Sequence, residues 1–60
     1  MEIQIGDSVA ITMFGKKYTG IIENIFANVD PIMKYKIAID ELRIVIFADE
    51  EKVLHWFKNK

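Results

Sequence analysis

Cysteine is absent from this 60-residue chain, and histidine occurs only once, at His55. These two scarcities exclude a disulfide framework and a metal site rich in cysteine or histidine. A chain without cysteine fits a reducing compartment, so we expect a cytoplasmic protein. A chain this short buries only about 60% of the surface that its unfolded form exposes. Stability must therefore come from a dense core or from an interface.

Long hydrophobic runs and an excess of one charge are also missing. The longest apolar run covers residues 44–48, far short of the roughly 20 residues that span a bilayer, and residues 1–4 lack the features of a signal peptide. Eight basic and nine acidic side chains give a formal net charge of -1. We expect no membrane contact, and any nucleic-acid role would need a local basic patch.

Glycine is scarce as well. Gly6, Gly15 and Gly20 are too far apart for a nucleotide-binding fingerprint, and we expect neither a cofactor nor a bound metal. Gly15 is expected to supply a positive φ in a turn at residues 14–17. Gly20 marks a place where the backbone bends or is closely approached.

Hydrophobic residues are abundant, at 52% of the chain. Val9, Ile11 and Met13 alternate with small or polar neighbours, which predicts a strand that the turn at residues 14–17 joins to a return strand from residue 18. The alternation then fails between Ile22 and Ile25. A bulge near residues 23–24 would return both side chains to one face and bend the strand.

Residues 27–33 form the clearest loop, because Pro31 cannot donate a backbone hydrogen bond to a sheet. This loop is unusually apolar. Its hydrophobic side chains either close one end of the core or offer a contact surface: Val29, Ile32 and Met33.

The second hairpin has the most regular pattern, with strands on either side of a four-residue loop at residues 40–43. Because side chains alternate along each strand, one set of residues forms an inner face and the other set forms an outer face. The inner face joins the first hairpin in the predicted core: Val9, Ile11, Ile22, Tyr35, Ile37, Ile39, Ile44 and Ile46. The outer face combines two lysines with two apolar side chains: Lys34, Lys36, Val45 and Phe47.

Residues 49–58 have a different periodicity. Asp49 suits a helix N-cap, acids follow in the first turn, and lysine occurs in the last turn. Four apolar residues lie within one arc of about 160° on a helical wheel: Val53, Leu54, Trp56 and Phe57. The pattern favours a short helix over a 3-10 turn followed by a strand, with both aromatic residues in the core.

Three stretches carry a family resemblance: residues 5–11 (IGDSVAI), 18–22 (YTGII) and 35–40 (YKIAID). Their spacing of glycine, valine and aspartate resembles that of SH3-like small β-barrels of the KOW and Tudor type. The resemblance implies one domain over residues 1–60, mostly β, with four to five antiparallel strands and a C-terminal helix or 3-10 turn plus strand. The basic character of ribosome and transcription binders among KOW domains is missing.

Catalysis has little support in the sequence. Asp7, Ser8 and His55 supply the residue types of a hydrolytic triad, but no strand-turn-helix motif surrounds the serine. Asp7 and Ser8 are typical turn formers. The acidic residues 49–51 lack the spaced ligands and the glycine of a calcium loop. The sequence therefore predicts a protein that is not an enzyme.

Two kinds of binding function remain. In the first, the outer face of the second hairpin binds a protein partner or a second copy as a homodimer, or an edge strand accepts an added strand. In the second, a nucleic-acid or ribosome-associated module uses a basic patch: Lys16, Lys17, Lys34, Lys36 and Arg43. High apolarity and an acidic pI of about 5.7 favour the first function.

Overall fold

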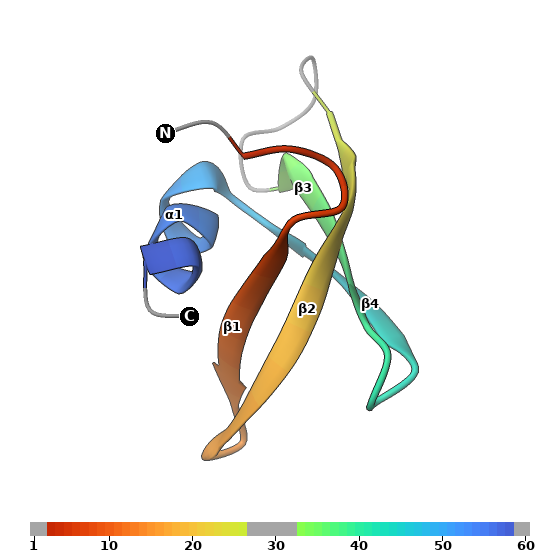
Figure 1. Ribbon diagram of the computed structural model, residues 1–60, viewed down its shortest axis with the longest axis vertical. Coiled ribbons are helices and arrows are strands. Elements are labelled where there is room, and N and C mark those ends of the chain that lie inside the picture. The colour runs from red at the N-terminus through yellow and green to blue at the C-terminus, as the bar shows by residue number, and fades with distance from the viewer. Residues whose placement is uncertain (1–2, 27–32, 59–60) are drawn as a thin grey trace.

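The computed structural model describes residues 3–26 and 33–58 of the chain. Its elements follow in the order β1 (Ser8–Met13), β2 (Lys16–Ile25), β3 (Tyr35–Ile39), β4 (Ile44–Ala48) and α1 (Glu50–Lys58) (Figure 1). The strands form one antiparallel sheet in chain order, so β1 and β4 are its edges. The prediction of a mostly β fold of antiparallel strands with a C-terminal helix is confirmed.

A two-residue turn joins β1 to β2. Phe14 and Gly15 have φ values of 54° and 72°, and Met13 pairs with Lys16. Positive φ at both turn residues matches the twist of the flanking strands and closes a hairpin in two residues. The expected turn at residues 14–17 was therefore too long, and both lysines belong to β2.

A bulge bends β2 where the sequence predicted it. The pairing of β2 with β3 shifts register between Ile22 and Asn24. Ile22 is buried, and Ile25 packs against the core on the same side. The extra residue in the bulge thus returns Ile25 to the inner face, whereas strict alternation would have placed it on the outer face.

Gly20 is required by close packing in the middle of the sheet. A Cβ atom at this position would lie 2.7 Å from Ile11 Cδ1 and 2.7 Å from Ile37 Cγ2. These two side chains belong to the strands on either side of β2. The expectation that the backbone is closely approached here is confirmed.

The second hairpin has the predicted four-residue loop at residues 40–43. Ile39 pairs with Ile44, and Ile37 pairs with Ile46, as the parity argument required. Arg43 closes the loop with a φ of 55°, and its N–H donates to the carbonyl oxygen of Asp40 at 3.1 Å.

The core lies between the inner face of the sheet and α1. Its buried side chains are Ile3, Val9, Ile11, Tyr18, Ile22, Tyr35, Ile37, Ile39, Ala48 and Val53. On β4, Ile46 is partly buried and packs against this core, whereas Ile44 is 38% exposed, so its placement in the core was wrong. β4 is an edge strand, and Ile44 lacks the flanking strand that shields residues of β2 and β3 on both sides.

The predicted loop at residues 27–33 is only partly described. Val29 and Ile32 lie outside the described residues, while Met33 is 47% exposed.

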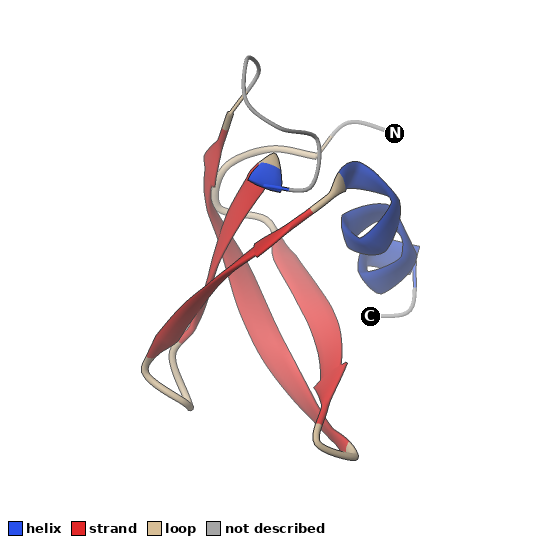
Figure 2. Ribbon diagram, turned by 180° about the vertical axis from the view of Figure 1, so that it is seen from behind, coloured by secondary structure: helices blue, strands red, loops and turns tan. Residues whose placement is uncertain are grey.

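The helix begins at the predicted cap. The Lys52 N–H donates to Asp49 Oδ1 at 2.8 Å, which satisfies one of the free amides of the first turn. The helix packs against β1, as seen from behind in Figure 2. Val53 is buried, and Trp56 and Phe57 are partly buried against the core. The helix therefore covers the inner face on the β1 side.

Candidate functional site

The outer face of the sheet carries three of the four predicted partner-binding residues. Lys36 lies opposite Phe47 across the pairing of β3 with β4, and Val45 lies two residues from Phe47 on the same face. Lys34 directly precedes β3 with the same parity as Lys36. Val45 and Phe47 are 45% and 44% exposed. The structure thus places Lys36, Val45 and Phe47 on the outer face. The ammonium of Lys34 instead lies toward α1, 5.6 Å from the ring centroid of the buried Tyr35.

Phe26 adds a second aromatic ring that was missed from the sequence. The ring centroids of Phe26 and Phe47 lie 6.4 Å apart with an interplanar angle of 35°, which is a favourable aromatic distance. The Phe26 N–H donates to the carbonyl oxygen of Lys34 at 2.7 Å. The direction of Phe26 could have been predicted from the sequence. The predicted bulge places Ile25 on the inner face, where it pairs with Tyr35, and the next residue must then point outward.

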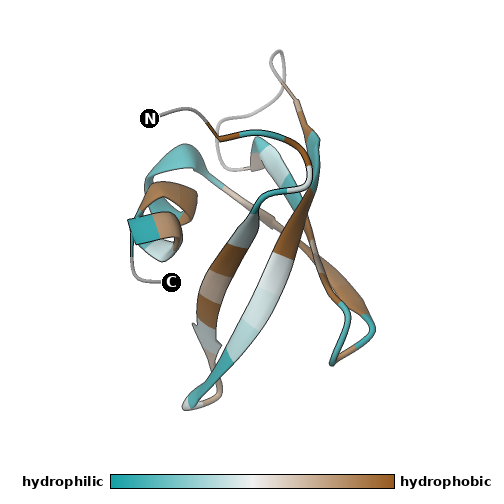
Figure 3. Cartoon of the chain, in the orientation of Figure 1, coloured by the Kyte–Doolittle hydropathy of each residue, from teal (hydrophilic) through white to brown (hydrophobic). Residues whose placement is uncertain are grey.

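An apolar row extends this surface across three strands. Ile21 lies opposite Ala38, and Ala38 lies opposite Val45. Figure 3 shows hydrophobic colours along β4, where the row reaches the edge of the sheet. We call the apolar residues of this face the outer strip: Ile21, Phe26, Ala38, Val45 and Phe47.

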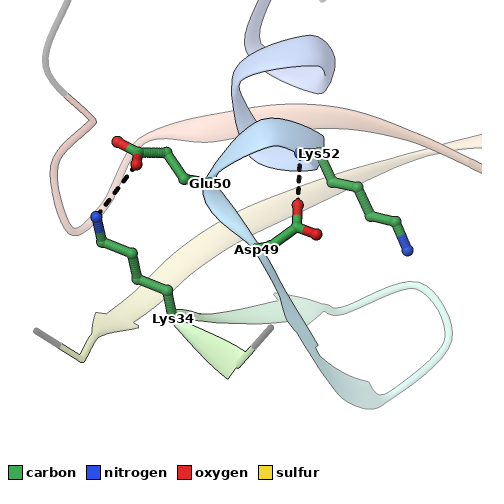
Figure 4. Close-up of polar contacts among 4 residues, drawn as sticks. All are labelled: Lys34, Asp49, Glu50 and Lys52. Atoms are coloured by element: carbon green, nitrogen blue, oxygen red, sulfur yellow. Dashed lines mark hydrogen bonds and ion pairs between the residues drawn. The ribbon is translucent and has the colours of Figure 1, made fainter. Parts of the chain in front are cut away.

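Both lysines of the predicted surface have acidic neighbours. Lys34 Nζ lies 3.4 Å from Glu50 Oε2 (Figure 4), and Lys36 Nζ lies 3.3 Å from Glu23 Oε1. Ion pairs as exposed as these contribute about 0–1 kcal/mol to stability. Their main effect is on the surface charge. Glu23 offsets Lys36 beside the outer strip, whereas Glu50 of α1 offsets Lys34 on the helix side of the sheet.

The cations of the alternative nucleic-acid patch are spread over the molecule. Lys16 Nζ lies 3.4 Å from Glu41 Oε2, which links the start of β2 to the loop after β3. Lys34 lies at the other end of β3 from that loop. With Lys34 and Lys36 paired as above, only Lys17 and Arg43 of this set have no ion pair within the described part of the chain.

The other candidate residues have local structural roles. Asp7 Oδ2 accepts the N–H of Gln4 at 2.8 Å, which is the turn role expected of this aspartate. The acidic residues 49–51 begin the helix, and Asp49 caps it. A shallow, open depression follows the helix and its cap, lined by Asp49, Glu51, Lys52, His55 and Trp56.

The described residues hold neither a metal-binding cluster nor a membrane-spanning helix. Within residues 3–26 and 33–58, no three side chains of histidine, aspartate or glutamate gather where they could hold a metal ion. No helix in these ranges has the length and apolarity needed to cross a membrane.

Comparison of the chain with protein families, with curated proteins and with solved structures finds no match. The resemblance to SH3-like small barrels of the KOW and Tudor type therefore stays a prediction.

Proposed function

We propose that this protein is a small, non-enzymatic interaction module of the cytoplasm that binds a protein partner, either another protein or a second copy of itself. Its contact surface is the outer strip with Lys36. The observation that carries the proposal is the exposure of Phe47, 44%, beside Phe26 on the face away from the helix. An exposed apolar patch with polar groups around it more often marks a contact site than an accident of folding.

The two kinds of residue on this surface support binding in different ways. Burial of the strip supplies affinity, at roughly 25 cal/mol for each Å² of apolar area removed from water, and exposed aromatic rings commonly act as anchors. The charged groups orient the partner. Because Glu23 accompanies Lys36, the rim carries both signs of charge. A partner with a mixed polar rim suits this surface better than a phosphate backbone.

Capture of partners from an extract of the native cells tests the proposal. The tagged full chain is compared with its Phe47→Ala and Phe14→Ala variants, and bound proteins are quantified by mass spectrometry. Phe14 is 87% exposed in the turn after β1, so its truncation makes the same chemical change away from the outer strip. We expect Phe47→Ala to lose the specific partners and Phe14→Ala to keep them. Full retention by Phe47→Ala would contradict the proposal.

A nucleic-acid interface would give a different result. Lys36→Ala would then weaken binding to an oligonucleotide and reduce its dependence on salt, because each phosphate contact releases counterions. The spread and pairing of the cations favour the protein partner instead.

A further inference from the structure

The edge strand β4 has an unpaired side. It pairs with β3, and no other strand of the described chain pairs with it. Every second residue of an edge strand directs its N–H and C=O groups away from the sheet. Natural edge strands are usually protected by charges, proline, bulges or a covering element. The five residues of β4 are all apolar, IVIFA, and three of them are exposed: Ile44, Val45 and Phe47.

We propose that β4 pairs with β4 of a second copy of this chain. The two strands run antiparallel about a two-fold axis at Ile46 and join the two sheets into one. The inference rests partly on the proposed function, because the outer strip contributes apolar contacts to the same interface. The unpaired backbone of β4 is a separate feature that the outer strip does not supply.

The sequence of β4 is complementary to itself in this register. Val45 lies opposite Phe47 of the second copy, and the reverse pair forms as well. Pairs of a β-branched and an aromatic residue stabilise antiparallel strands. On the inner face, Ile46 meets Ile46 and the larger Ile44 meets the smaller Ala48. A shift of two residues would remove part of this overlap, and a shift of one would turn the inner face of one copy outward.

Charges on either side of β4 favour the antiparallel orientation. Arg43 directly precedes the strand and Asp49 directly follows it. The two-fold axis brings Arg43 of each copy level with Asp49 of the other, whereas a parallel pair would place like charges together. Arg43 has no ion pair within the described residues.

The interface also joins the two outer strips. Since Val45 of one copy lies opposite Phe47 of the other, the row from Ile21 through Ala38 to Val45 continues into the second sheet. The homodimer would thus present one longer apolar surface to a further protein partner.

A single introduced cysteine tests both the dimer and its register, because the chain has no cysteine of its own. In the Ile46→Cys variant the two cysteines face each other across the axis, with Cα atoms about 4.5–5.5 Å apart, within the range of a disulfide. Ile44→Cys is the matched control on the same strand and face. Its counterpart lies four residues along, roughly 13 Å away, which is beyond disulfide reach.

We expect mild oxidation of the full chain to give a covalent dimer with Ile46→Cys and little with Ile44→Cys. The unmodified protein should sediment as a dimer at high concentration, and Arg43→Glu should weaken that dimer about two- to thirtyfold through two reversed charge pairs. Equal cross-linking of both cysteine variants, or none in Ile46→Cys, would overturn the proposal, as would a monomer at every concentration. If Phe47→Ala loses partner capture but Ile46→Cys does not cross-link, the dimer alone is refuted. If Ile46→Cys cross-links but Phe47→Ala captures partners as before, the partner surface alone is refuted.

Discussion

Lys36 and Phe47 lie directly opposite each other on the outer face, where β3 pairs with β4. The ammonium group of Lys36 lies 3.3 Å from Glu23, while the ring of Phe47 lies beside Phe26. An exposed aromatic ring next to a lysine that is paired with a carboxylate is typical of the place where the apolar centre of a protein interface meets its polar rim. This pair therefore has the composition that we propose for the whole outer face, an apolar contact surface with charged groups at its rim.

Replacement of Gly20 by alanine should destabilise the sheet by about 1–3 kcal/mol, as overpacking of a core commonly does. The added Cβ atom would lie 2.7 Å from side-chain atoms of Ile11 and Ile37. Thr19→Ala is the control, since Thr19 is exposed on the outer face, and we expect a change within about 0.5 kcal/mol. Urea unfolding measures the stability of both variants. Equal unfolding midpoints for Gly20→Ala and Thr19→Ala would show that Ile11 and Ile37 can move aside without a loss of stability, which would contradict the prediction.

Phe14→Asn should stabilise the protein by about 1 kcal/mol, because a non-glycine residue in the left-handed region is strained and asparagine tolerates that region best. Phe14 has a φ of 54° and is 87% exposed, so little burial is lost. Phe14→Ala is the control, because alanine has no preference for this conformation. If both variants unfold at the same urea concentration, the strain at Phe14 is negligible.

Two isoleucines of the second hairpin should respond very differently to truncation. Ile37 is fully buried between β2 and β4, and Ile37→Ala should cost about 2–5 kcal/mol. Ile44 is 38% exposed at the edge, and Ile44→Ala should cost less than about 1.5 kcal/mol. Guanidinium unfolding compares the two. A larger loss for Ile44 than for Ile37 would contradict the register of the hairpin.

Much of the fold follows from local patterns in the sequence. Parity alone places Ile37 and Ile46 on the same face, because a four-residue loop preserves the alternation of side chains. The bulge follows from the broken spacing of Ile22 and Ile25, and the helix follows from the cap at Asp49. Each of these features depends on residues that are close together in the chain.

The features that the sequence did not yield depend on contacts between distant segments. Ile44 has the parity of the core, but parity does not tell which strand becomes an edge of the sheet. Tyr18 is buried and was missed, because the turn before it closes in two residues with a phenylalanine at a position that usually takes asparagine or glycine. Phe26 was also missed, although the predicted bulge places Ile25 on the inner face and so turns the next residue outward.

The most direct test of the account is one variant, Phe47→Ala, measured for both stability and association. If Phe47 is a contact residue, its truncation weakens partner binding or self-association while the free energy of unfolding falls by well under the roughly 3–5 kcal/mol typical of a core phenylalanine. The opposite result, a loss of stability in that range with unchanged association, would place Phe47 in the core and contradict the proposed surface.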